Sequence, residues 1–155
     1  MISRSFVSAK LINLRKIHIF VYTDIPRPPR IDFIMLIDNE RHVIKDYKQN
    51  STSGLYIFDL DLPFDYPFGE SISINMTYFG NIPVDISSVI KFAEFDSLFY
   101  YDGNDLGASY SKEETTFVLW APLADKVLLD LENSDGSFTF HNMIREEKGI
   151  YRLTI

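Results

Sequence analysis

Two aspartates with strand spacing are the first residues in this sequence that could do chemistry. Asp59 and Asp61 lie two positions apart in an alternating stretch, so on a β-strand both side chains lie on the same face. A pair of neighbouring carboxyl groups is the arrangement that glycoside hydrolysis requires. A solvent-exposed strand face has the same pattern and is the favoured interpretation. A small hydrolase built on this pair is therefore the least favoured of three functions that the sequence suggests.

Metal-ligating and nucleophilic residues do not cluster in the sequence. The three histidines, His18, His42 and His141, are far apart, and none has a second ligand at the spacing of a zinc site or a catalytic triad. The acidic turn at residues 102–105 offers oxygen ligands, but it lacks the 12-residue spacing and the final glutamate of a calcium loop. The sequence therefore predicts no metal, no cofactor and no catalytic residue.

Aromatic side chains in two loops are the candidate contacts for a sugar, because exposed rings offer flat faces for stacking. The candidates are Phe64, Tyr66 and Phe68 in a proline-rich loop, and Tyr100, Tyr101 and Asp102 in a second loop. Packing is the favoured role of both groups, onto a core for the first and between modules for the second. The single tryptophan, Trp120, could also stack on a sugar, but its position before Ala121-Pro122 favours a place in the core.

The composition limits the partners. Hydrophobic residues make up 46% of the chain and charged residues 24%, which is typical of a globular protein. Fifteen basic and 22 acidic residues give a net charge of -7, which opposes binding to nucleic acid and to anionic membranes. There is no cysteine, and residues 1–20 contain no apolar run of the length of a signal peptide or a membrane span. We therefore expect a cytoplasmic protein without nucleic-acid or membrane partners.

Alternating apolar and polar residues predict that the chain is made of β-strands. The clearest strands are expected at residues 16–22, 54–60, 71–76, 115–120, 126–131, 137–144 and 150–155, with a further strand at 86–95. Turn residues separate them, among them Pro26, Pro28 and Pro29, and Asp38-Asn39. No stretch predicts a good amphipathic helix. The sequence therefore predicts an all-β protein of two immunoglobulin-like β-sandwich modules.

A boundary near residue 95 divides these modules into residues 1–95 and 96–155. The second module has only about 60 residues, whereas an immunoglobulin-like sandwich usually needs ~100. We therefore expect the second module to be truncated, with an uncovered apolar face and an unpaired sheet edge. An edge of this kind pairs readily with another chain, which predicts a homodimer.

Three short motifs follow one another in the second module. They are Tyr-Asp-Gly at residues 101–103, Leu-Gly-Ala at 106–108 and Phe-x-x-Trp-Ala-Pro at 117–122. In this order and spacing they resemble the start of the starch module of type I pullulanases, in glycoside hydrolase family 13. The resemblance implies a carbohydrate-binding module of family 48, with Gly107, Trp120 and Pro122 as structural motif residues. It also predicts that Trp120 and Leu129 lie on neighbouring β-strands.

The resemblance implies a parent enzyme that hydrolyses α-1,6 links in pullulan, starch or glycogen. In that family a TIM barrel supplies a nucleophilic Asp, a Glu acid/base and a second Asp, near a YNWGY-like signature. The signature does not occur in the 155 residues, and a β/α barrel needs at least ~200 residues. The chain is therefore expected to be a non-catalytic N-terminal fragment whose modules support the catalytic barrel, its missing partner. By position, residues 1–95 resemble the extra N-terminal module of intracellular pullulanases.

The alternative is a self-standing glycan-binding or regulatory module, because such sandwiches also tether partners to storage polysaccharide. Glycan-binding relatives of the module are expected to have a tryptophan in the loop after the second core strand. Here that loop, residues 132–136, reads Glu-Asn-Ser-Asp-Gly. The α-glucan is therefore expected to be a weak or indirect partner.

Overall fold

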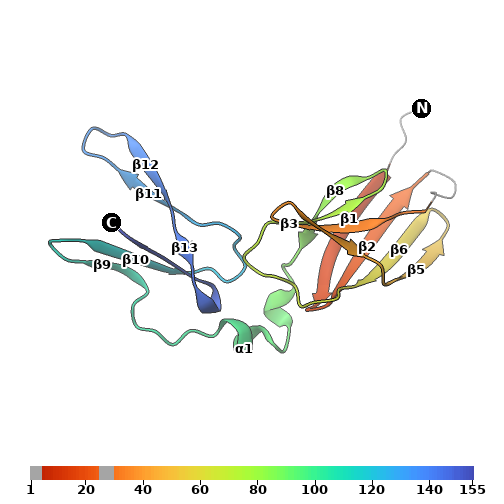
Figure 1. The fold of residues 1–155 in the computed structure, drawn as a ribbon, viewed down its shortest axis with the longest axis horizontal. Helices are drawn as coiled ribbons and strands as arrows, with labels where there is room; N and C mark the ends of the chain where they lie inside the picture. The colour runs from red at the N-terminus through yellow and green to blue at the C-terminus, as the bar shows by residue number, and fades with distance from the viewer. Residues whose placement is uncertain (1–4, 25–29) are drawn as a thin grey trace. The chain divides into compact units, whose positions relative to one another are not determined.

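The computed structural model describes residues 5–24 and 30–155 (Figure 1). The predicted turn at Pro26, Pro28 and Pro29 lies outside the described residues. Of the described residues, 53% are in strands and 8% are helical, so the predicted all-β fold is confirmed. None of the helices in this part of the chain is long and apolar enough to cross a membrane.

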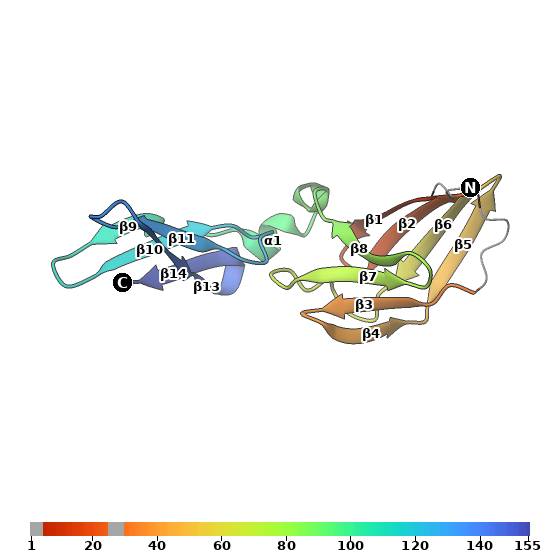
Figure 2. The ribbon, with the colours of Figure 1, turned by 90° about the horizontal axis from the view of Figure 1, so that it is seen from above.

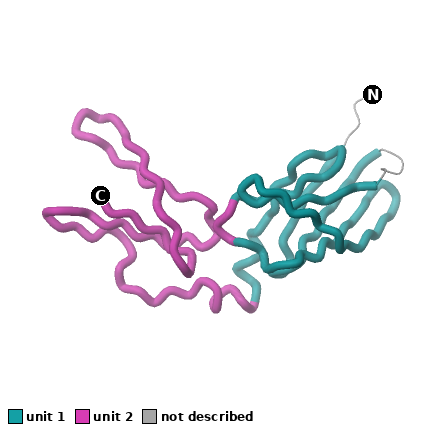
Figure 3. The backbone as a smooth tube through the Cα atoms, viewed as in Figure 1, with its two compact units in different colours: residues 1–67, 71–92 teal, residues 68–70, 93–155 magenta. Residues whose placement is uncertain are grey.

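Two compact units make up the chain (Figure 3). Unit 1 comprises residues 1–67 and 71–92, and unit 2 comprises residues 68–70 and 93–155. Residues 68–70 therefore interrupt unit 1 in the sequence. This short segment packs with the residues of unit 2 and belongs to that unit. Each unit has a sheet of its own.

Among the described residues of unit 1, eight strands form one sheet in the order β4-β3-β7-β8-β1-β2-β6-β5. These strands are β1 (Ser5–Asn13), β2 (Lys16–Thr23), β3 (Phe33–Ile37), β4 (Glu40–Ile44), β5 (Tyr47–Thr52), β6 (Leu55–Asp61), β7 (Ile72–Met76) and β8 (Gly80–Asp85). All neighbours are antiparallel except β1 and β8. The sheet folds over into two layers, with β3, β4 and β7 opposite β2, β5 and β6 (Figure 2).

The core of unit 1 lies between these layers. Ile17, Ile19 and Val21 alternate along β2 and are fully buried, as the period-two pattern predicted. Phe33 on β3 meets Phe58 on β6 edge to face, with 5.0 Å between ring centroids, so the rings join the two layers. The predicted Asp38-Asn39 turn joins β3 to β4, and both residues have positive φ, which is typical of a type I′ hairpin.

The end of unit 1 differs from the prediction of a strand at residues 86–95. The last strand is β8, and the chain then forms the short 3-10 helix η1 (Val89–Lys91). The physical reason is local: the Asp85 carboxylate accepts a hydrogen bond of 2.8 Å from the Ser87 amide, which turns the backbone out of the sheet. Val89 is then buried against unit 1 on the helical turn.

Unit 2 has a four-stranded sheet in the order β13-β14-β10-β9 and a separate hairpin of β11 and β12. Its elements are α1 (Phe95–Phe99), β9 (Gly107–Tyr110), β10 (Thr115–Trp120), β11 (Leu128–Glu132), β12 (Phe138–Asn142), β13 (Ile144–Arg145), η2 (Glu147–Gly149) and β14 (Ile150–Thr154). Residues 137–144 are not one strand as predicted. The chain leaves the hairpin at Met143, whose amide bonds to the Val127 carbonyl, and β13 pairs with β14 instead.

The turn after Trp120 carries the chain from the sheet to the hairpin. Arg145 donates hydrogen bonds to the carbonyl oxygens of Pro122 (2.9 Å) and Ala124 (3.1 Å). The Tyr151 hydroxyl also donates to the Ala124 carbonyl, at 2.7 Å, and the Arg145 guanidinium lies 5.4 Å from the centroid of the Tyr151 ring. Two side chains from β13 and β14 therefore fix the conformation of the Ala-Pro turn.

This turn explains why one prediction is wrong. Trp120 and Leu129 do not lie on neighbouring strands, because β10 belongs to the four-stranded sheet and β11 pairs only with β12 among the described residues. The two sheets instead contribute to one pocket of about 340 Å³, which Leu119 and Leu129 both line. This arrangement is that of two sheets facing each other in a β-sandwich.

Gly149→Ala is expected to destabilise unit 2 more than Gly136→Ala does. Both glycines have positive φ, +73° and +81°, so both substitutions strain the backbone. A Cβ at Gly149 would lie 2.3 Å from Pro122 Cα, whereas nothing lies within 4 Å of a Cβ at Gly136. We expect losses of about 2–4 kcal/mol and about 1 kcal/mol, respectively, in urea unfolding followed by Trp120 fluorescence. Equal losses would contradict the close packing of Gly149 on Pro122.

Candidate functional site

The first group of predicted sugar contacts does not form a platform. Tyr66 is only 7% exposed, so its ring is not available to a ligand. Phe64 packs edge to face on His42, and Phe68 packs edge to face on Phe99 with 5.3 Å between ring centroids. Tyr66 is buried and the rings of Phe64 and Phe68 have different protein partners, so the three rings do not form one exposed platform.

The aspartate pair lies on a strand face where each carboxylate has a basic side chain as its neighbour. Strands β2 and β6 are in a register that places His18 opposite Asp59 and Lys16 opposite Asp61. The His18 Nε2 atom lies 2.7 Å from Asp59 Oδ1, and the Lys16 Nζ atom lies 3.2 Å from Asp61 Oδ1. Each carboxylate therefore faces a basic side chain across the strands, which is a structural arrangement. Within the described ranges, no group of three His, Asp or Glu side chains has the geometry of a metal site.

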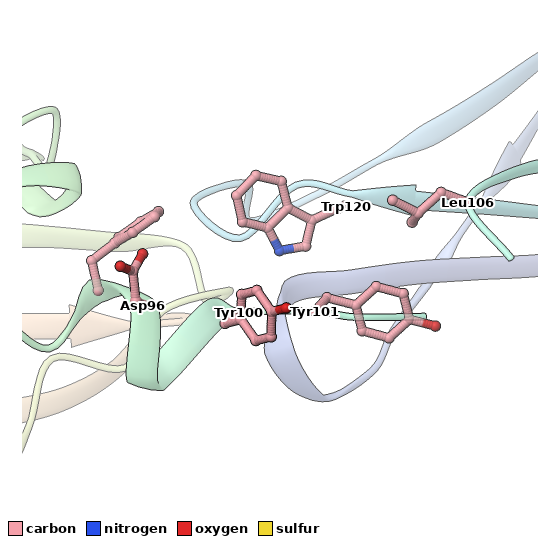
Figure 4. A pocket seen from close by; sticks show the side chains of 6 residues that line it. Asp96, Tyr100, Tyr101, Leu106 and Trp120 are labelled. Carbon is pink, nitrogen blue, oxygen red and sulfur yellow. The ribbon is translucent and has the colours of Figure 1, made fainter. Parts of the chain in front are cut away.

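A pocket in unit 2 contains Tyr100 and Tyr101, two of the three residues in the second group of candidates (Figure 4). It has a volume of about 180 Å³ and is lined by Phe95, Asp96, Tyr100, Tyr101, Leu106 and Trp120. Four of these six side chains are aromatic. The pocket is therefore the place in unit 2 where rings on α1, on the following loop and on β10 come together.

Trp120 was predicted to lie in the core. This prediction is wrong, because 41% of its surface is exposed. Its indole N–H is shared by two backbone carbonyl oxygens, that of Phe99 at 2.9 Å and that of Lys148 at 3.1 Å. Phe95 packs against the indole at a steep angle, with 6.4 Å between ring centroids. The tryptophan is thus held by its polar edge, and its apolar face is left to line the pocket.

A network of charged groups positions the loop beside Trp120. The Tyr101 hydroxyl donates to one oxygen of Asp105, and Arg152 on β14 donates to the other oxygen at 2.8 Å. These two hydrogen bonds hold the pKa of Asp105 below its ordinary value, with Tyr101 the larger cause. The Asp105 carboxylate in turn raises the pKa of Tyr101, and Asp105 and Glu146 together raise that of Arg152.

The remaining motif residues have structural positions. Pro122 is buried in the turn that Arg145 fixes, and Gly107 is the exposed first residue of β9. Asp102 is exposed and does not line the pocket. The sequence interpretation missed Phe95 and Asp96, because residues 86–95 were expected to form a strand. The signal that could have found them is the spacing of Phe95 and Phe99, which places both rings near each other on one helical turn.

Comparison with known proteins finds a family match within unit 2. The family described as carbohydrate-binding module 48 (isoamylase N-terminal domain) matches residues 105–155. The pullulanase of Bacillus subtilis (strain 168) is 37% identical over 93 residues, which are 59% of this chain and 13% of that protein. The β-rich fold and the module match agree with each other, because residues 105–155 lie in unit 2 and contain most of its strands.

Solved structures match nearly the whole chain. The pullulanase from Anoxybacillus sp. LM18-11 complexed with maltotriose is 28% identical with a TM-score of 0.81, over 97% of this chain and 22% of that one. Pullulanase type I from Bacillus subtilis str. 168 complexed with maltose is 26% identical with a TM-score of 0.78, over 98% of this chain and 21% of that one. The chain corresponds to the N-terminal region of pullulanases, as its motifs predicted, and spans 13% to 22% of the length of these relatives.

Asp105→Asn is expected to lower the melting temperature of unit 2 by at most about 4 °C near pH 7, because exposed ion pairs are weak. The pKa of Asp105 is lowered by folding, so its contribution is present above about pH 4 and is lost as the pH falls through the lowered pKa. The difference between variant and wild type should therefore shrink in acid, as circular dichroism melts would show. Asp130→Asn, on the exposed face of β11, is the control. A difference that persists unchanged at about pH 2 would contradict the network.

Proposed function

We propose that this chain is the non-catalytic N-terminal part of a pullulanase that hydrolyses α-1,6-glucosidic branch links in pullulan, starch or glycogen. The observation that carries the proposal is the match of 97% of the chain to a pullulanase whose structure holds maltotriose. The matched length also supports it, because the chain spans only 22% of that protein. The reaction then belongs to a catalytic barrel elsewhere in the parent. We also propose the cytoplasm as its compartment, in agreement with the absence of cysteine.

The two units would serve the parent in different ways. Unit 1 has a buried apolar core between two layers of strands (Figure 2), which suits a supporting module. Exposed aromatic side chains occur on both units, but in unit 2 the exposed rings of Tyr100 and Trp120 line one pocket. Exposed aromatic rings are natural contacts for the apolar faces of sugars. Unit 2 is therefore the proposed contact with α-glucan, and the contact is weak because it uses one small module.

Affinity electrophoresis through amylopectin tests the glucan contact. The 155-residue chain is expected to migrate more slowly in a gel that contains amylopectin than in a plain gel, relative to a protein that does not bind glucan. Because the reaction is assigned to the barrel, the same chain is expected to release no reducing sugar from pullulan. Unchanged migration would contradict glucan binding by these units, and hydrolysis would contradict the non-catalytic assignment.

Self-association is a second proposed property of unit 2. Strand β12 pairs only with β11 among the described residues, and Phe138 and Phe140 on it are 57% and 63% exposed. An apolar strand with a free edge favours pairing with a second copy of the chain.

Light scattering during gel filtration measures this association. The chain is expected to elute as a dimer whose fraction rises with concentration. Phe140→Lys should shift it to the monomer, because a charge at the strand edge opposes pairing. Tyr110→Lys, on the exposed strand β9, is the matched control and should leave the dimer intact. A monomer at every concentration would refute the proposal.

A further inference from the structure

Residues inside and outside the matched module both line the pocket at Trp120. Leu106 and Trp120 lie within residues 105–155, which match the carbohydrate-binding module family. Phe95, Asp96 and Tyr100 come from α1 and the residue after it, which precede the matched segment. The pocket is therefore formed where α1 meets the module. Residues 105–155 alone would lack Phe95, Asp96 and Tyr100 of its lining.

The walls of this pocket offer ring faces and one carboxylate. The indole N–H of Trp120 is already bonded to the carbonyls of Phe99 and Lys148, so the part of the ring that remains for a ligand is apolar. Tyr100 is 66% exposed and lies below the indole in Figure 4, and the Asp96 carboxylate lies at one end of the pocket. Asp96 and Tyr100 are held at a fixed spacing, because the Tyr100 amide donates to the Asp96 backbone carbonyl at 2.8 Å.

This combination selects the chemistry of the ligand. A carboxylate in a chain of net charge -7 repels phosphates and other anions, and one carboxylate among rings is too few ligands for a divalent cation. A sugar ring has a C–H face that packs on aromatic carbon and hydroxyl groups that donate to a carboxylate. The volume of about 180 Å³ is below the ~300–1,000 Å³ of pockets for drug-sized ligands, so the space suits one ring.

We propose that this pocket binds one α-glucosyl unit of a maltooligosaccharide, stacked on Trp120 and Tyr100, with Asp96 accepting hydrogen bonds from its hydroxyl groups. The inference rests on the proposed glucan contact and names its site. An apolar side chain of another protein segment is the other occupant that ring faces would accept. The carboxylate favours the sugar, because burying it against an apolar side chain would leave it without a hydrogen-bond donor.

The single tryptophan makes the site directly observable. Trp120 is the sole tryptophan of the 155 residues, so intrinsic tryptophan fluorescence reports on this pocket alone. Titration of the chain with maltotriose is expected to change the emission of Trp120 in a saturable way and to protect it from quenching by acrylamide. Sorbitol, a linear polyol without a ring, is the negative control.

Two variants test the other walls and keep Trp120 as the reporter. Tyr100→Ala and Asp96→Asn are each expected to weaken maltotriose binding by about three- to tenfold, through loss of one stacking face or one charged acceptor. Both side chains are exposed, so the fold should persist, and circular dichroism checks this. Tyr110→Ala removes an 80% exposed ring on β9 that does not line the pocket, and it should leave the affinity unchanged.

The outcomes separate this inference from the proposed function. Retardation by amylopectin without any fluorescence change would place glucan binding elsewhere and overturn the pocket assignment alone. Absence of both signals would overturn both proposals. A fluorescence change that Tyr100→Ala and Asp96→Asn leave unaffected would also overturn the assignment, because the pocket walls would then take no part in binding.

Discussion

The hydrogen bonds of one indole N–H hold the functional part of unit 2 together. Trp120 ends β10, and its N–H is shared by the carbonyls of Phe99, at the end of α1, and Lys148, in η2. Three segments that are far apart in sequence therefore depend on one donor. Each hydrogen bond contributes about 1 kcal/mol, and the two together favour one orientation of the indole. That orientation presents the apolar face of the ring to the pocket.

Further hydrogen bonds in unit 2 hold the turn that follows Trp120. Arg145 and Tyr151 fix the carbonyls of Pro122 and Ala124, and Gly149 allows Pro122 to approach its backbone. The Trp-Ala-Pro motif is thus a junction of three elements. The tryptophan donates a hydrogen bond to the end of α1, and the chain continues from the proline turn into the hairpin. This explains why a motif shared with pullulanases has a structural role and can also provide a wall for a ligand. The proposed glucan contact follows from which ring face the junction leaves exposed.

The sequence predicted the features that depend on residues close together in the chain, such as the alternation of buried and polar side chains along a strand. Ile17, Ile19 and Val21 alternate with polar residues, and this pattern alone places them in the core of a sheet. The strand expected at residues 86–95 is absent because a single carboxylate, Asp85, turns the chain, and apolar content does not reveal that competition. The site depends still more on tertiary contacts. The acceptors of Trp120 lie 21 and 28 residues away, so its partial exposure and its pocket could not be derived from its neighbours in sequence.

Hydrogen exchange at the indole N–H tests this account most directly. The chain has one tryptophan, so one side-chain indole signal in a proton–nitrogen correlation spectrum belongs to Trp120. This proton is expected to exchange with solvent deuterium slowly, on the timescale of the backbone amides of β10, because two carbonyl oxygens accept hydrogen bonds from it. Exchange as fast as that of a free indole would contradict the hydrogen bonds on which the junction and its pocket depend.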